Sequence, residues 1–121
     1  MYDIHFDHPV WVHFIGIGGI SMSGLAEILH DRGFKVSGSD MKASPLTEHL
    51  ESLGISVQFP QKSENIVPGI ELCVYTAAIS EDNPEFQEVK RQNIPMMSRA
   101  ELLGRIMKNY KEAINVSGTH G

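Results

Sequence analysis

Glycines cluster near the start of the chain, in the run Gly16-Ile17-Gly18-Gly19-Ile20-Ser21-Met22-Ser23-Gly24. A short apolar segment, Val12 to Ile15, precedes the run and predicts a buried strand. Leu25-Ala26-Glu27-Ile28-Leu29 follows it and predicts a helix. Glycine lets a backbone turn sharply and approach a ligand, and the first N–H groups of the helix point at that ligand. A strand, a glycine turn and a helix in this order predict a diphosphate site.

The glycine spacing matches the dinucleotide fingerprint G-x-G-x-x-G only in part. Gly16 and Gly18 fit it, but Ser21 stands at the third glycine position, Gly19 is extra and Gly24 falls three positions late. Because even a complete fingerprint is a weak signal, a glycine turn without a ligand is the alternative. If the loop binds a diphosphate, we expect Gly18→Val to abolish that binding and to leave the fold largely intact, because a Cβ would fill the phosphate space.

Composition limits the class of protein. A length of 121 residues is that of one domain, and a hydrophobic fraction of 41% predicts a globular chain with a core. The net charge of −5 argues against a nucleic-acid surface. No apolar run approaches the roughly 18 residues of a membrane span, and residues 1–10 do not resemble a secretory signal. We therefore expect a cytoplasmic protein that binds neither nucleic acid nor membrane.

Several side chains that could be reactive are expected to be structural. Cys73, the only cysteine, lies in an apolar run and predicts a buried, inert thiol. His13 lies inside the first predicted strand, and His5 and His8 lack partners at metal-ligand spacing, so we expect no metal site. Glutamates at i, i+3 spacing predict solvated helix faces at Glu48 with Glu51 and at Glu85 with Glu88.

Helix and strand patterns alternate along the chain. Helices are predicted at residues 21–32, 45–53, 84–93 and 99–109, and strands at 12–15, 35–39, 55–59, 72–76, 94–97 and 113–116. Residues 60–69 predict a loop with one helical turn. Strands separated by helices predict an α/β fold, a Rossmann-like open parallel sheet of about five strands with helices on both faces.

Polar residues or glycines follow three of the predicted strands, at the edge where such sheets bind ligands. The first is the glycine run, the second is Gly38-Ser39-Asp40 and the third is Thr76-Ala77-Ala78-Ile79-Ser80. Asp40, 24 positions after Gly16, is placed to accept hydrogen bonds from ribose hydroxyls, with a loop carboxylate or helix cap as the alternative. The small residues of the third segment, Thr76 to Ser80, leave room for a ligand beside the backbone. The alternative is a tight turn that only connects the strand to the following loop.

Arg99 opens the last predicted helix, where a cation is unfavourable with the helix dipole. Its position predicts either a contact to a phosphate or carboxylate or an ordinary surface arginine.

Taken together, these segments resemble the Mur ligases. The glycine run departs from G-x-G-x-x-G as that family's first loop does. Three further segments resemble the family in the same order: Ser37 to Asp40, Thr76 to Glu85 and Arg99 to Leu103. Ser117-Gly118-Thr119-His120-Gly121 resembles the opening of the family's ATP loop, which continues with lysine and threonine. The resemblance covers nearly the whole chain after Pro9.

The resemblance implies an enzyme of three domains, for the UDP-sugar, for ATP and for the amino acid. In this chain it implies an N-terminal extension at residues 1–10, a Rossmann-like UDP-sugar-binding domain at 11–110 and the truncated start of the ATP-binding domain at 111–121. The most similar family member would phosphorylate the lactyl carboxylate of UDP-N-acetylmuramate with ATP and Mg²⁺, and L-alanine would attack the acyl phosphate. The member that recycles murein tripeptide is a nearby alternative.

The resemblance also implies the site residues. Those for the UDP-sugar are Gly16, Gly18, Gly19, Ile20, Ser21, Met22, Ser39, Asp40, Ala77, Ala78, Ile79 and Arg99, and those of a partial ATP loop are Gly118, Thr119, His120 and Gly121. The stretch from Gly18 to Met22 would hold the diphosphate, Ser39 and Asp40 would face the uridine, and Arg99 would reach toward the sugar. No catalytic residue is expected in this piece, which alone would be inactive. An NAD-binding module of a dehydrogenase or redox-sensing regulator, or a protein-interaction domain, are the alternatives.

Overall fold

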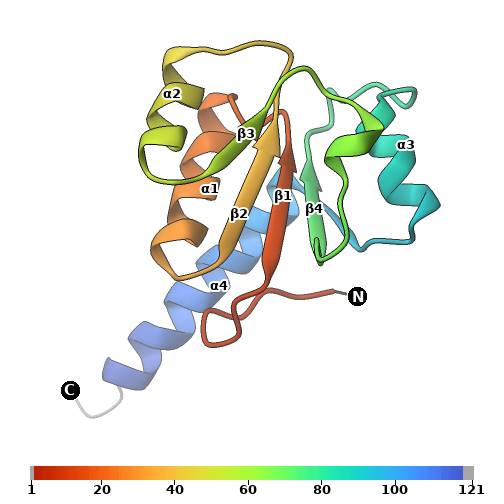
Figure 1. Cartoon of the computed structure of the whole chain (residues 1–121). Helices are drawn as coiled ribbons and strands as arrows, with labels where there is room; N and C mark the ends of the chain where they lie inside the picture. Colours follow the sequence, from red (N-terminus) through yellow and green to blue (C-terminus); the bar gives the residue numbers. More distant parts are fainter. Residues whose placement is uncertain (1, 119–121) are drawn as a thin grey trace.

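The structure, a computed structural model, describes the backbone of residues 2–118 and the side chains of residues 2–112. Five parallel strands form one sheet in the order β3-β2-β1-β4-β5 (Figure 1). They are β1 (Trp11–Ile15), β2 (Lys35–Ser39), β3 (Ser56–Gln58), β4 (Leu72–Tyr75) and β5 (Met96–Ser98). The chain adds β2 and β3 on one side of β1, and then β4 and β5 on the other side, so the switch point of the sheet lies between the carboxyl ends of β1 and β4. The predicted α/β fold with an open parallel sheet is confirmed.

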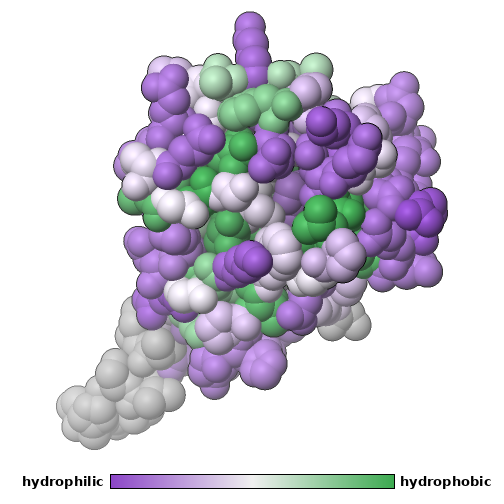
Figure 2. Space-filling view, viewed as in Figure 1, coloured by the Kyte–Doolittle hydropathy of each residue, from purple (hydrophilic) through white to green (hydrophobic). Residues whose placement is uncertain are grey.

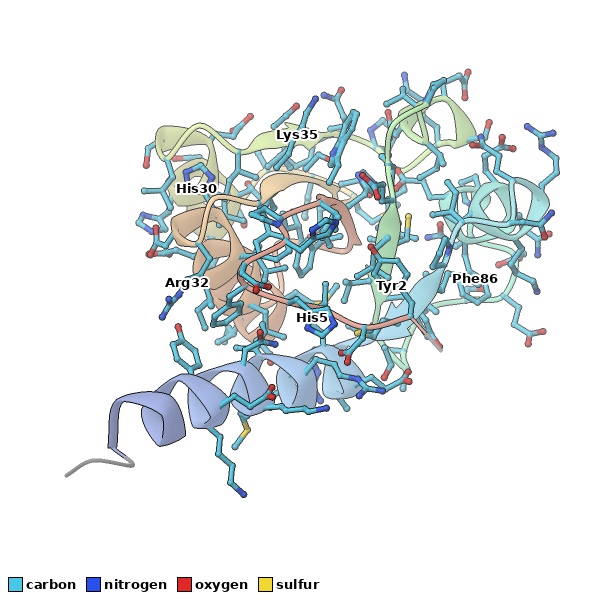
Figure 3. The ribbon with its side chains drawn as sticks, turned by 90° about the horizontal axis from the view of Figure 1, so that it is seen from below. Tyr2, His5, His30, Arg32, Lys35 and Phe86 are labelled. Carbon is cyan, nitrogen blue, oxygen red and sulfur yellow. The ribbon has the colours of Figure 1, made fainter. Side chains whose placement is uncertain are left out.

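Helices cover both faces of the sheet, but unevenly. The helices are α1 (Ile20–Asp31), α2 (Pro45–Ser52), α3 (Pro84–Arg91) and α4 (Arg99–Gly118), with a 3₁₀ turn, η1 (Ser63–Asn65). The first two and α4 lie on one face, whereas α3 and η1 lie on the other (Figure 1). Figure 3, seen from below, shows α4 along one side of the sheet and Lys35 of β2 on the opposite side. The expected turn within residues 60–69 is η1.

Alternation along the strands divides the buried side chains into two clusters. The larger lies between the sheet and the helices α1, α2 and α4 and includes Val12, Phe14, Leu29, Leu50, Val74 and Ile106. The smaller lies under α3 and the η1 loop and consists of Ile15, Ile66, Ile70, Cys73 and Val89. The face of the molecule in Figure 2 shows hydrophobic residues in small separate groups among hydrophilic ones.

Local capping explains where two helices begin. Ser44 and Thr47 form a capping box at the start of α2, since the Ser44 hydroxyl accepts from the Thr47 N–H and the Thr47 hydroxyl accepts from the Ser44 N–H. Asn83 caps α3 by accepting from the N–H groups of Glu85 and Phe86. Each helix has proline at its first position, as the sequence predicts.

The last helix is longer than predicted. The sequence predicts a helix that ends near Asn109 and a strand at 113–116, but α4 continues to Gly118. The predicted strand is therefore wrong. A parallel strand needs a neighbouring strand to satisfy its N–H and C=O groups, and no described strand pairs with this segment. A helix satisfies those groups within itself, and Lys111, Glu112 and Ala113 favour helix.

The first residues of the chain pack against α4. The Asn109 side chain accepts a hydrogen bond from the Phe6 N–H (2.9 Å) and donates one to the Ile4 carbonyl (2.8 Å). The Phe6 ring meets Tyr110 edge-on, with centroids 5.2 Å apart, and the Arg32 guanidinium lies 4.6 Å from the Phe6 centroid. Figure 3 shows this segment, labelled at Tyr2 and His5, running alongside α4. The segment predicted as an extension thus contributes Ile4 to the main core.

Candidate functional site

The glycine loop joins the end of β1 to the start of α1. Gly16 has a φ of +85°, a left-handed conformation that glycine adopts without strain. The Ser39 carbonyl at the end of β2 accepts from both the Gly16 and the Ile17 N–H, each at 2.9 Å. Gly19 is the N-cap of α1 and supplies no side-chain cap, and the first turn carries no acidic residue. No side chain therefore caps the N–H groups of Ile20, Ser21 and Met22 in that turn, as an anion site requires.

Asp40 holds the middle of this loop. Its Oδ2 accepts a hydrogen bond from the Gly18 N–H at 2.8 Å, and its Oδ1 accepts one from the Met41 N–H at 2.8 Å. A Cβ added to Gly18 would lie 2.5 Å from Asp40 Oδ2 and 3.0 Å from Thr47 Cγ2. The sequence interpretation places this Cβ in the phosphate space, whereas in the structure it faces Asp40.

A cavity of about 240 Å³ lies at the switch point between β1 and β4. Gly16 lines it from the glycine loop, and Thr76, Ala78, Ile79 and Ser80 line it from the loop after β4. The Ile79 N–H donates to the Thr76 carbonyl at 3.0 Å, so this second loop is a turn. Ala77 and Ala78 lie on it, and Ala78 is exposed. The structure thus brings together two of the strand ends that the sequence singles out.

Arg99, the first residue of α4, reaches the same region. Its Nη1 donates a hydrogen bond of 3.1 Å to the hydroxyl of Ser21 in the first turn of α1. The two residues are 78 positions apart, and the sequence resemblance places them in one site. A guanidinium at this point supplies positive charge beside the exposed amino end of a helix, which favours an anionic ligand.

Two predicted residues, Ser39 and Met22, have buried side chains. The Ser39 hydroxyl is fully buried and donates to Glu85, so it cannot face a ligand. Met22 is also buried, so only its backbone N–H is available. Ile20, in contrast, is 85% exposed and presents an apolar surface at the edge of the loop.

Glu85 is the residue that the sequence interpretation places wrongly. The spacing predicts a solvated face with Glu88, but Glu85 is fully buried and its carboxylate accepts hydrogen bonds from His13 and Ser39. Burial alone would raise the pKa of Glu85, but the hydrogen bonds from His13, Asn65 and Ser39 hold that pKa below its ordinary value. Val89, four residues on and buried, is the available signal, because positions i and i+4 share a helix face.

His13 is a structural histidine, as predicted. Its Nδ1 lies 2.9 Å from the Ser37 hydroxyl and its Nε2 lies 2.8 Å from Glu85 Oε1. Both ring nitrogens therefore have partners, and the ring is buried.

A larger hollow lies away from these groups. It has a volume of about 520 Å³ and is lined by Trp11, Phe34, Lys35 and Gly54, among others. These residues lie at the amino ends of β1 and β2 and after α2, and none belongs to the predicted site. The smaller cavity is the candidate site, because ligands in such sheets bind at the carboxyl ends of the strands.

The predicted ATP loop lies mostly outside the described residues. Gly118 ends α4, and Thr119, His120 and Gly121 are not part of the described chain.

None of the described helices is long and apolar enough to cross a membrane.

The family model "Mur ligase family, catalytic domain" matches residues 11–111. The chain belongs to the Mur ligase family. Two curated Mur ligases show how much of such a protein it represents. It is 60% identical to the UDP-N-acetylmuramate–L-alanine ligase of Lachnoclostridium phytofermentans and 61% identical to that of Agathobacter rectalis. Each match covers 100% of this chain and 26% of the relative, so the chain spans about a quarter of their length.

Solved Mur ligases share the fold. The UDP-N-acetylmuramate–alanine ligase of Thermotoga maritima matches with a TM-score of 0.78 at 31% identity, over 82% of this chain and 23% of that one. The UDP-N-acetylmuramate:L-alanyl-γ-D-glutamyl-meso-diaminopimelate ligase of Neisseria meningitides matches with a TM-score of 0.70 at 30% identity, over 76% and 29%. A dipicolinate synthase chain from Bacillus halodurans, at 16% identity and a TM-score of 0.54 over 79% and 40%, shares the fold alone.

Proposed function

We propose that this chain binds UDP-N-acetylmuramate as the first part of an ATP-dependent ligase that adds L-alanine to it in peptidoglycan precursor synthesis. The observation that carries the proposal is the uncapped amino end of α1, which opens at the switch point beside the loop after β4. The names of relatives 60% and 61% identical to this chain support the same activity.

The described residues would hold the ligand through backbone and local charge. The N–H groups of Ile20, Ser21 and Met22 would donate to the diphosphate, with the dipole of α1 behind them, whereas the Gly19 N–H already donates to the Gly16 carbonyl. Arg99 and the hydroxyl of Ser21 would extend this anion site toward the sugar. Because the net charge is −5, an anionic ligand needs such local donors.

The nucleoside would lie along the edges of this loop. Asp40 would accept from the uridine while its Oδ2 holds Gly18, and the turn from Ala77 to Ile79 would border the nucleotide. The exposed Ile20 offers an apolar contact at the rim.

The chemistry would belong to the whole enzyme. ATP and Mg²⁺ would activate the lactyl carboxylate there, and Gly118 to Gly121 would form the first half of the ATP loop. No catalytic residue is assigned in this chain. The cytoplasm is the proposed compartment, since the lone thiol of Cys73 suits reducing conditions.

Isothermal titration of the 121-residue chain with UDP-N-acetylmuramate tests the proposal. We expect saturable binding of one ligand per chain, which UDP displaces and NAD does not. A chain that is folded by circular dichroism yet gives no binding heat at about millimolar ligand would contradict the proposal, with about 1 mM marking the weakest affinity worth assigning. Displacement by NAD would instead favour the dinucleotide-binding alternative.

The neighbour from Neisseria meningitides raises a second question, because its name also contains UDP-N-acetylmuramate. Binding by this chain does not separate the two enzymes. ATP turnover by the whole protein does, and we expect it with L-alanine and not with the tripeptide L-alanyl-γ-D-glutamyl-meso-diaminopimelate. The 60% identity to the L-alanine ligase favours this result.

A further inference from the structure

Glu85 is a buried carboxylate at the start of a helix. It is the second residue of α3 and has 0% exposure, and its own N–H donates to the Asn83 cap at 2.9 Å. A buried carboxylate is costly unless its oxygens are well paired. The partners of Glu85 therefore show what this residue holds in place.

Four donors meet the two oxygens of Glu85. Oε1 accepts from the Ser39 hydroxyl at 2.7 Å and lies 2.8 Å from His13 Nε2. Oε2 accepts from the Asn65 side-chain amide at 2.7 Å and from the Lys62 N–H at 3.1 Å. One carboxylate thus joins β1, β2 and the η1 loop to α3.

The contact with Glu85 places a proton on Nε2 of His13. A carboxylate only accepts, so Nε2 carries the proton that points at Glu85. Nδ1 lies 2.9 Å from the Ser37 hydroxyl, whose oxygen accepts from the Trp11 indole N–H at 2.9 Å. A row of hydrogen bonds thus runs from Trp11 through Ser37 and His13 to Glu85.

The Ser39 branch leads to the glycine loop. The same residue whose hydroxyl binds Glu85 offers its carbonyl to the N–H groups of Gly16 and Ile17. The next residue, Asp40, accepts from the N–H of Gly18. Ser39 and Asp40 therefore accept hydrogen bonds from three successive N–H groups of the loop. The hydroxyl of Ser39 in turn donates to Glu85.

We propose that Glu85 is a positioning residue for the diphosphate loop. It acts through the Ser39 hydroxyl and fixes the end of β2, to which the N–H groups of Gly16, Ile17 and Gly18 are hydrogen-bonded. The role in ligand binding rests on the function proposed above, whereas the effect on the loop does not. Because Glu85 itself lies behind the loop, it acts on the ligand only through this backbone.

Two pairs of variants separate positioning from general destabilisation. Ser39→Ala and Asn65→Ala each remove one hydrogen bond to Glu85, but only Ser39 adjoins the loop. Glu85→Gln and Glu88→Gln make the same change on one helix, but Glu88 is bonded to Arg91 and Gln92 outside the network. If Glu85→Gln does not fold, Ser39→Ala still tests the proposal.

Amide hydrogen exchange, resolved by residue in the 121-residue chain, is the first measurement. We expect Ser39→Ala and Glu85→Gln to speed exchange at Gly16, Ile17 and Gly18 by about tenfold relative to the interior of α1. Asn65→Ala and Glu88→Gln should leave that ratio unchanged. The proposal would be overturned if the ratio of loop exchange to α1 exchange were the same in Ser39→Ala as in the parent. It would also be overturned if Glu85→Gln raised the exchange rate of all amides by one common factor.

Titration with UDP-N-acetylmuramate is the second measurement. We expect Ser39→Ala to weaken binding about tenfold while Asn65→Ala binds as the parent does. Parental affinity in Ser39→Ala would overturn the role of Glu85 in binding and leave the proposed function intact. A parent chain that does not bind would overturn the proposed function, and the exchange ratios would still decide the effect on the loop.

Discussion

The Oδ2 atom of Asp40 lies 2.8 Å from the backbone nitrogen of Gly18. This contact ties the end of β2 to the middle of the glycine loop, 22 residues away in sequence. It explains why position 18 needs glycine although its φ is not positive, since a Cβ there would collide with the carboxylate. The loop is therefore shaped by a side chain as well as by glycine flexibility.

Gly18→Ala is expected to destabilise the chain by about 1–3 kcal/mol, because the Asp40 carboxylate must leave its hydrogen bond with the loop. Gly24→Ala is the matched control. Gly24 lies inside α1 with no atom within 4 Å of an added Cβ, so alanine should stabilise the helix by about 0.5–1 kcal/mol. Urea unfolding measures both. Equal effects of the two substitutions would argue against the collision.

Arg99→Ala is expected to lower the affinity for UDP-N-acetylmuramate about tenfold, because one charge-assisted contact to the ligand is lost. Its hydrogen bond to Ser21 lies at the surface, so the thermal midpoint should change little. Arg91→Ala removes an exposed arginine that is paired with Glu88 on α3 and should bind as the parent does. Calorimetric titration compares the three proteins, and equal affinities would remove Arg99 from the site.

The sequence predicts best where the signal is local. Ser44 with Pro45 and Asn83 with Pro84 mark helix starts that the structure confirms, since caps and proline act on their own turn. Prediction fails where the partner is distant. The i, i+3 spacing of Glu85 and Glu88 predicts that Glu85 faces solvent. It cannot reveal the four donors to Glu85, which come from three other parts of the chain.

The same reasoning applies to the ends of the strands. The sequence correctly predicts that Gly16 and Ala78 lie at one edge of the sheet, because all parallel strands end at the same edge. It cannot decide that the Ser39 hydroxyl turns inward to Glu85 while the Ser39 carbonyl turns to the loop. The apolar segment at 113–116 is ambiguous for a related reason, since a short apolar run fits a strand or a helix.

Stability should depend on pH through Glu85. The pKa of Glu85 is lower in the folded chain than its ordinary value of about 4.3, so its contribution is complete above that pH and is lost as the pH falls through the folded pKa. Glu85→Gln lacks this titration. We expect the difference in unfolding free energy between parent and variant to be constant above about pH 5 and to shrink below about pH 4. Urea unfolding across this pH range measures the difference. A difference that grows in acid would contradict a lowered pKa of Glu85 in the folded chain.

Cys73 should be unreactive in the folded chain. Burial raises the pKa of its thiol to about 12, and the negative charge of Glu85 adds to the shift. Because the thiolate is the reactive form, a disulfide-exchange reagent at about pH 8 should label no native chain over minutes and one thiol per chain in denaturant. Stoichiometric labelling of the native chain would show that the smaller cluster opens.

Asn109→Ala should destabilise the chain by about 1–3 kcal/mol, because it leaves the Ile4 carbonyl and the Phe6 N–H without their side-chain partner. Asn109 is half-buried, so water replaces part of what is lost. Lys108→Ala, at the exposed neighbouring position, should change stability by less than about 0.5 kcal/mol. Thermal unfolding compares the two, and a similar midpoint for both would show that residues 4–6 are held by apolar packing alone.

The two attachments of α4 have a mechanical consequence. The helix contacts the first turn of α1 at Arg99 and the start of the chain at Asn109, and Leu102 and Ile106 pack in the core between these two contacts. Its 20 residues make a stiff rod about 30 Å long. Because Leu102 and Ile106 anchor the helix between these two contacts, the packing that holds residues 4–6 at Asn109 and the placement of the Arg99 guanidinium beside Ser21 depend on one rigid element.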